Sequence, residues 1–230
     1  EVIIKMKNDK LYEEFLYRIK SFCKKVFYCE LGLSDWEDRT EWKIDGRHGR
    51  DVTEQLKRKI RLKGKKVLDI GSGLGEFVVF ANKYGVDAWG IEPDPESVKI
   101  SVLRGKISGI RNKFLIAVGE NLPFREGTFD VVTCVWVLEH CKQPKELLRE
   151  IKRVLNEEGY CYLHVPNYLR FREPHYMIFW IPFLPKMLGK LYLRLRGRKS
   201  DYLEHLNFIK PFSIVDAQIL LSASITISVI

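Results

Sequence analysis

The chain has 230 residues, 46% of them hydrophobic and 30% charged, which is enough for one well-buried domain. Its five cysteines are odd in number and include no C-x-x-C pair, so they favour reduced thiols in a cytoplasmic protein over a disulfide framework or a zinc site. The first ten residues are charged and have no apolar core, so we expect no secretory signal peptide.

The net charge of +9 is concentrated in two runs. Residues 57–66 hold seven basic residues in ten, and residues 194–199 hold four in six. Such runs are usually solvated surface, and that is the default interpretation. The sharper interpretations are contact with nucleic acid or with an anionic membrane face.

Residues 1–50 are predicted to form an N-terminal helical cap segment, because apolar side chains recur at helical spacing through its first half. Trp36 and Trp42 are expected to lie in a polar loop after this helix. A further helix, from about residue 51 to 62, is expected to lead into the first strand.

From residue 51 to 165, short apolar runs alternate with amphipathic segments of helical spacing. This alternation predicts an α/β fold, a doubly wound Rossmann-like sheet that is mostly parallel, with helices on both faces and right-handed crossovers. A ligand of such a sheet lies outside the carboxyl ends of its strands. The predicted strands are 66–70, 87–92, 113–117, 129–135 and 159–164, and the predicted helices are 74–84, 94–106 and 143–155.

Residues 166–207 break the alternation and are predicted to be an aromatic and basic insertion after the fifth strand. A segment this long in place of a short connection is usually functional. Its apolar stretch 176–185 is too short and too rich in proline to span a bilayer. Three roles stay open for the insertion: a lid over the substrate, a membrane anchor at the interface, or a subunit contact. A helix at 211–222 and a strand at 224–230 are expected to end the core sheet within 208–230.

A glycine-rich turn follows the first predicted strand and indicates a pocket for a nucleoside-bearing cofactor. The turn carries Gly71, Gly73 and Gly75, and the second strand ends in the acid Glu92. The dinucleotide fingerprint G-x-G-x-x-G needs a tiny residue where Glu76 stands, and a glutamate there would repel a pyrophosphate. S-adenosylmethionine has no phosphate and carries a sulfonium and an amino-acid end, so acids around the turn suit it.

The turn belongs to a series of motifs between about residue 65 and residue 168. The first motif is 68–75, which contains the turn and reads Leu-Asp-Ile-Gly-Ser-Gly-Leu-Gly. It is followed by 119–124, 129–132, 137–140, which reads Val-Leu-Glu-His, and 147–155 with 159–163. Their order and spacing resemble the class I S-adenosylmethionine-dependent methyltransferases, in the small-molecule branch with the Leu-Glu-His motif.

The resemblance implies how the cofactor is held. Glu92 would accept hydrogen bonds from both ribose hydroxyls, and Asp69 would position the glycine loop and the cofactor's amino group. Val118 stands where many relatives have an aspartate for adenine, so the next three residues would hold adenine instead. The expected cofactor-binding residues are Asp69, Gly71, Ser72, Gly73, Gly75, Glu92, Pro93, Gly119, Glu120, Asn121 and Val135.

Two further departures from the family concern a metal ion and the edge of the sheet. Some quinone-forming relatives bind magnesium with two acids and a histidine around the Leu-Glu-His motif. Here Glu139 and His140 are present, but Trp136 stands where the other acid would be, so no metal is expected. The family's sheet usually ends in a hairpin strand after 224–230, which we expect to be absent or supplied otherwise.

Methyl transfer to a hydroxyl needs a base, and histidine titrates near neutral pH. His140 and His175 are the predicted catalytic residues, and His164 is a third candidate. For each of them a structural role is the alternative. Arg47 or His48 is a candidate to close over the cofactor's carboxylate, with ordinary surface placement as the alternative.

The motifs and the aromatic insertion predict an S-adenosylmethionine-dependent O-methyltransferase of a small molecule or of a glycan- or lipid-linked acceptor. The charge motivates an alternative, a methyltransferase of RNA or another nucleic acid, although residues 134–136 lack the motif that grips a flipped base. A non-catalytic binding protein on the same scaffold is the second alternative. We expect a cytoplasmic protein, weigh peripheral contact with the inner face of the membrane, and leave the oligomeric state open.

Overall fold

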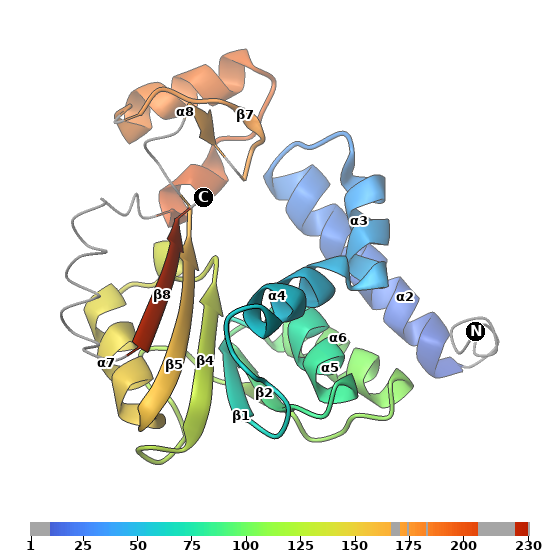
Figure 1. Cartoon of the computed structure of the whole chain (residues 1–230). Coiled ribbons are helices and arrows are strands. Elements are labelled where there is room, and N and C mark those ends of the chain that lie inside the picture. Colours follow the sequence, from blue (N-terminus) through green and yellow to red (C-terminus); the bar gives the residue numbers. More distant parts are fainter. Residues whose placement is uncertain (1–9, 167–170, 174, 183, 207–223, 230) are drawn as a thin grey trace.

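The computed structural model describes residues 10–166, 171–173, 175–182, 184–206 and 224–229 (Figure 1). At its centre lies a six-stranded sheet of order β3-β2-β1-β4-β5-β8, in which every neighbouring pair is parallel. The strands are β1 (Lys66–Ile70), β2 (Asp87–Glu92), β3 (Phe114–Ile116), β4 (Phe129–Val135), β5 (Leu155–Val165) and β8 (Ser224–Val229). The predicted α/β fold is confirmed, and the strand order reverses between β1 and β4, where such sheets bind ligands.

The strands bury two separate cores, one on each face of the sheet, because successive side chains of a strand point to opposite faces. Leu68 and Ile70 of β1 pack in the core that helix α7 (Pro144–Val154) covers. Val67 packs in the other core, under helices α4 (Arg47–Lys57) and α5 (Glu76–Lys83). Figure 1 shows α7 on one side of the sheet and α4 and α5 on the other, as the doubly wound prediction requires.

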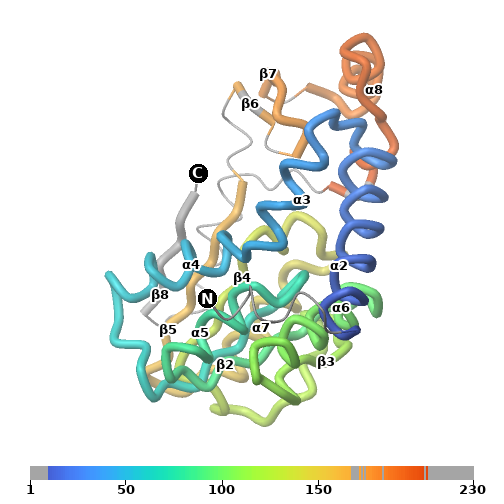
Figure 2. Tube along the Cα trace, turned by 90° about the vertical axis from the view of Figure 1, so that its right-hand side faces the viewer, coloured from blue at the N-terminus to red at the C-terminus, as the bar shows by residue number. Residues whose placement is uncertain are grey.

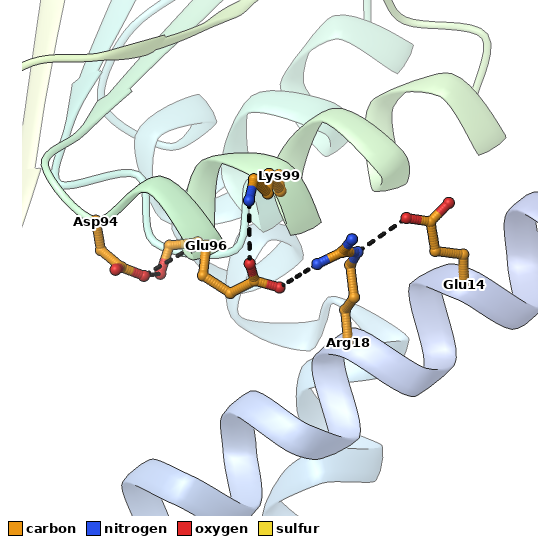
Figure 3. A network of polar contacts seen from close by, with 6 residues as sticks. Glu14, Arg18, Asp94, Glu96 and Lys99 are labelled. Carbon is orange, nitrogen blue, oxygen red and sulfur yellow. Dashed lines mark hydrogen bonds and ion pairs between the residues drawn. The ribbon is translucent and has the colours of Figure 1, made fainter.

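Helix α2 (Lys10–Cys23) lies outside this layer and packs on helix α6 (Pro95–Ile107) through an apolar cluster that includes Phe15, Ile19 and Ile100. Figure 3 shows a polar link beside this cluster, in which Arg18 of α2 reaches Glu96 of α6. The Nη1 atom of Arg18 donates to Oε1 of Glu96 at 2.7 Å. Because the pair is partly exposed, the apolar cluster contributes most of the attachment.

The predicted loop around Trp36 and Trp42 is wrong, because both residues belong to helix α3 (Trp36–Asp45). A π-helical turn (Lys24–Glu30) separates α3 from α2, and Gly46, in the left-handed conformation, ends α3. The buried guanidinium of Arg104 in α6 donates to the carbonyl oxygens of Lys43 and Ile44 in the last turn of α3. A distant residue therefore stabilises a helix whose own polar composition favoured a loop.

The described part of the insertion folds into a small lobe with the N-terminal segment. It contains the short strands β6 (Arg172–Glu173) and β7 (Ile178–Phe179), helix α8 (Lys186–Leu195) and the 3-10 turn η3 (Asp201–His205). Figures 1 and 2 place this lobe beyond the carboxyl ends of β4 and β5, next to the turn between α2 and α3. Its core is made of Leu31, Leu33, Tyr176, Ile178, Trp180, Leu193, Leu203 and Leu206.

Strand β8 confirms the predicted strand near residue 224, and it pairs with β5 from Tyr160↔Ser224 to Val165↔Val229. The helix predicted at 211–222 lies outside the described residues. Strand β5 begins at Leu155, four residues earlier than predicted, because Leu155 already pairs with Phe129 across a register shift. Among the described residues, none of the helices has the length and apolar character needed to cross a bilayer.

Candidate functional site

The loop after β1 contains three glycines in the left-handed conformation, with φ of 68° at Gly71, 51° at Gly73 and 74° at Gly75. A Cβ atom at Gly71 would lie 2.3 Å from a methyl group of Val137, and one at Gly75 would lie 2.8 Å from the ring of Phe114. At Gly73 it would meet nothing within 4 Å. Gly71 and Gly75 are therefore required for packing, whereas Gly73 leaves its backbone facing open space.

A cavity of about 450 Å³ opens over this loop. The loop and the ends of β1 and β4 form one wall, and the N-terminal segment with α5 forms the other. The residues that line it are Trp42, Lys43, His48, Val52, Asp69, Gly71, Ser72, Gly73, Glu76, Phe77, Val135 and Trp136. Of the predicted cofactor-binding residues, Asp69, Gly71, Ser72, Gly73 and Val135 are in this set.

Glu92, at the end of β2, holds the same loop from the side. Its Oε2 atom accepts a hydrogen bond from the backbone N–H of Gly73 at 3.1 Å, and its Oε1 accepts one from Asp94 at 3.2 Å. Burial raises the pKa of the Glu92 carboxyl, against the lowering effect of these two bonds. Each carboxylate oxygen has a second lone pair, so the group can still accept from a diol beside Gly73. Pro93 follows on the exposed surface.

Asp69 is buried at the floor of the cavity, where its Oδ1 accepts a hydrogen bond from the hydroxyl of Thr133 at 2.7 Å. Burial, with smaller contributions from the charges of Glu92 and Glu76, raises the pKa of Asp69 to about 7 against the lowering effect of the Thr133 bond. Two acids, Asp69 and Glu76, therefore line the cavity, and a third, Glu92, supports its loop from the side. Such a field favours a ligand with a cationic centre and disfavours a pyrophosphate.

The predicted adenine-binding residues lie apart from the residues that line the cavity. A Cβ at Gly119 would lie 2.6 Å from a methyl group of Leu147, so this glycine allows α7 to pack closely. The Oε1 atom of Glu120 accepts from the backbone N–H of Lys142 at 3.1 Å. Asn121 is exposed. Their contact with adenine stays a prediction.

The N-terminal wall of the cavity was not predicted as a unit. Lys43 reaches from α3 across the cavity edge, and its Nζ atom lies 2.9 Å from Oε2 of the buried Glu76. His48 also lines the cavity, and burial lowers the pKa of its imidazole. Arg47, the other candidate, instead pairs with Asp45 at the surface. The sequence carries no local motif for Lys43, since only the packing of α3 against α2 and α4 brings it here.

The two predicted catalytic histidines come together at the far side of Trp136. The rings of His140 and His175 have centroids 5.6 Å apart, and Trp136 meets the ring of His175 edge-on at 5.7 Å. His164, the third candidate, stacks on Trp136 with centroids 5.8 Å apart. Trp136, directly after β4, has a φ of 61°, which is strained for a tryptophan.

Two glutamates complete this polar cluster, and neither was predicted as a catalytic residue. The side chain of Glu173 is fully buried, and its Oε1 lies 2.8 Å from Nδ1 of His175 while its Oε2 accepts from the backbone N–H of Tyr176. Glu139 is also fully buried, and burial raises the pKa of its carboxyl to about 7. The arrangement can bind a polar group and move a proton.

The family model described as "Methyltransferase domain" matches residues 68–163. Among curated proteins, the chain is 32% identical over 152 residues to a ubiquinone biosynthesis O-methyltransferase of Bordetella avium (strain 197N), covering 65% of this chain and 58% of that protein. It is 39% identical over 95 residues to norajmaline N-methyltransferase of Rauvolfia serpentina, covering 40% of this chain and 32% of that protein.

Among solved structures, the YcgJ protein from Bacillus subtilis matches with a TM-score of 0.46 and 22% sequence identity, over 66% of this chain and 67% of that chain. The chain spans less than two thirds of the length of these two curated relatives.

Proposed function

We propose that this chain, which belongs to the class I S-adenosylmethionine-dependent methyltransferases, methylates a hydroxyl group of a small molecule or of a lipid- or glycan-linked acceptor. The observation that carries the proposal is the polar cluster of the buried Glu139, the partly buried His175 and the exposed His140 beside Trp136, which itself lines the loop cavity. One relative's name specifies O-methylation and another's N-methylation, so the acceptor atom is argued from the site.

The residues around the glycine loop fit S-adenosylmethionine. Asp69, Glu76 and Glu92 suit its cationic groups, and Glu92 lies where a carboxylate can accept from a ribose diol beside Gly73. When bound, this cofactor supplies an electrophilic methyl group on a sulfonium. The loop places backbone, without any side chain, against the ligand at Gly73.

A hydroxyl acceptor has to lose its proton as it is methylated, and the cluster can promote that loss. Glu139 is buried, and Glu173 holds the imidazole of the partly buried His175 in a fixed orientation. An amine that is neutral in water needs less help of this kind. The cluster therefore favours oxygen as the acceptor atom.

The proposal is tested with a radiolabelled methyl donor and fractionated cell extract, followed by identification of the labelled product. We expect label in a hydroxyl-bearing fraction with the parent protein and little label with His175→Ala. Glu92→Ala should weaken cofactor binding by roughly 1.5–3 kcal/mol, because charge-assisted hydrogen bonds are lost. Label in RNA, together with an affinity for RNA that falls steeply as the salt concentration rises, would favour a nucleic-acid methyltransferase instead. No binding of the cofactor by the parent protein would favour a non-catalytic role.

The exposed surface of helix α8 in the insertion lobe supports the proposal that the acceptor is an amphiphilic molecule at an anionic membrane surface. Helix α8, at the top of Figure 1, buries Leu193 and leaves a stripe of large apolar side chains exposed. Exposed basic residues flank the stripe, including Arg196 and Lys199. An apolar stripe flanked by basic side chains suits the interface of an anionic bilayer. The stripe consists of Met187, Leu188, Leu191 and Leu195.

Sedimentation with vesicles tests this surface. We expect the chain to sediment with vesicles that contain anionic phosphatidylglycerol and much less with neutral phosphatidylcholine. Leu191→Asp should abolish the sedimentation, whereas Tyr17→Asp, a change at an exposed apolar residue of α2, should leave it unchanged. Equal sedimentation of the two variants would contradict the membrane surface.

A further inference from the structure

The polar cluster brings together donor atoms from distant parts of the chain. Glu139 and His140 lie in the 3-10 turn η2 (Leu138–His140) after β4, and His175 lies between β6 and β7 in the insertion. One carboxylate oxygen of Glu139 and one ring nitrogen of each histidine all lie within 4.8 Å of one another. This set of one carboxylate and two imidazoles is a common set of metal ligands in proteins.

The buried groups of the cluster lack the partners that such groups usually have. Within the part of the chain that the structure describes, neither carboxylate oxygen of Glu139 accepts a hydrogen bond, although this side chain is fully buried. The Nε2 atom of His175 is likewise buried without a partner among the described residues. Burial of an unpaired carboxylate is costly, so the two groups point to a cationic ligand between them.

Glu173 adds an independent observation. Its carboxylate holds Nδ1 of His175 at 2.8 Å and is itself fixed by the backbone N–H of Tyr176. A proton on Nδ1 leaves the lone pair on Nε2, on the other side of the ring. Histidines that bind metal ions usually donate their second ring N–H to a carboxylate in this way. The buried Glu173–His175 pair therefore presents Nε2 as a ligand atom.

We propose that Glu139, His140 and His175 bind one divalent transition-metal ion and leave coordination positions open for the acceptor hydroxyl. Nitrogen donors favour an ion such as zinc or cobalt over magnesium. Such an ion would bind the acceptor hydroxyl and lower its pKa towards neutrality, so that the proton would pass to water. The oxygen would then attack the methyl carbon, with the thioether of the cofactor as the leaving group. The sequence predicted no metal because Trp136 replaces an acid, but the fold supplies a third ligand from the insertion.

This inference deepens the proposed function, but the binding of the ion can be tested without methyl transfer. We would titrate the metal-depleted, untagged full chain with Co²⁺ and record its visible absorption spectrum, which reports protein-bound cobalt. We expect one bound ion per chain. His175→Ala and Glu139→Gln should each abolish the spectrum, and Glu173→Gln should weaken Co²⁺ binding by about 10–100-fold.

His164→Gln is the matched control, because His164 is also buried with an unpartnered Nε2 among the described residues but is not one of the three ligands. It should bind Co²⁺ like the parent. Binding of S-adenosylhomocysteine shows that each variant is folded, and its loss in the parent would count against the proposed function alone. The metal site is overturned if the parent binds no stoichiometric Co²⁺, or if His175→Ala and Glu139→Gln bind it as tightly as the parent.

Discussion

The loop cavity and the polar cluster lie on two sides of Trp136, and they differ in how their charged groups are satisfied. At the cavity and its loop each acid has at least one partner inside the fold: Asp69 has Thr133, Glu76 has Lys43, and Glu92 has two backbone N–H groups. In the cluster, neither oxygen of Glu139 accepts a hydrogen bond from the described residues. The acids of the cavity are thus held by the fold before a ligand arrives, although Oε1 of Glu76 is left without a partner among the described residues, whereas Glu139 needs a ligand to be satisfied at all.

The largest expected effect distinguishes the polar cluster, which acts in methyl transfer, from the loop cavity, which binds the cofactor. Glu139→Gln or His175→Ala should lower methyl transfer by about 10²–10⁴-fold, because the cluster no longer promotes loss of the proton from the acceptor hydroxyl. The affinity for S-adenosylmethionine should change less than about twofold, since neither residue lines the cavity. Label incorporation and equilibrium dialysis measure the two quantities. A parallel fall in both would show that the regions are one site.

The second effect concerns Gly73, the glycine of the cavity loop whose backbone faces open space. Gly73→Ala should weaken cofactor binding by about 10–100-fold, because the new methyl group occupies ligand space. Gly109→Ala is the control, since Gly109 has a similar positive φ and an equally open surrounding away from the cavity. It should have the same cost in stability and no effect on binding. Equal affinities of the two variants would place the ligand elsewhere.

The third effect tests the N-terminal wall. Lys43→Met leaves the buried carboxylate of Glu76 without its partner and should destabilise the fold by about 1–3 kcal/mol in urea unfolding. The double variant Lys43→Met/Glu76→Gln should regain most of this loss. Arg18→Met removes the more exposed pair of Figure 3 and should cost less than about 1 kcal/mol. A larger loss from Arg18→Met would contradict the ranking.

The smallest effect is a pH dependence. Burial raises the pKa of Asp69 to about 7, so the ligand-free group is neutral below that pH, with Thr133, Glu92 and Glu76 as its neighbours. A cationic cofactor favours the ionised form, so its affinity should fall by about tenfold per pH unit below 7 and level off above it. Calorimetry between pH 5.5 and 8 measures this, and Asp69→Asn should flatten the profile.

The raised pKa of Asp69 also predicts how the stability of the ligand-free protein changes with pH. Unfolded Asp69 ionises near its ordinary pKa, so between that value and about 7 the folded state binds the extra proton. The contribution of this group to the stability of the ligand-free protein should therefore decline as the pH rises towards 7. A rise in the stability difference between parent and Asp69→Asn over this range would contradict the shift.

Local patterns predicted the parts of the fold that depend on neighbours in sequence. The strands 66–70, 87–92 and 129–135 have the predicted bounds, because continuous apolar runs between turns specify buried parallel strands. Helix α3 was missed because its polar residues have no strong apolar face, and Arg104 from α6 holds its last turn. Lys43 was missed with it.

The sequence by itself therefore determined the parallel sheet, the glycine loop and the acid at the end of β2, because these follow from backbone geometry over a few residues. Only the tertiary structure decided which polar side chains meet. His175 reaches Glu139 because the insertion packs its own apolar core against Leu31 and Leu33, far away in the chain. Such contacts depend on long-range burial of apolar surface, which leaves no local pattern in the sequence.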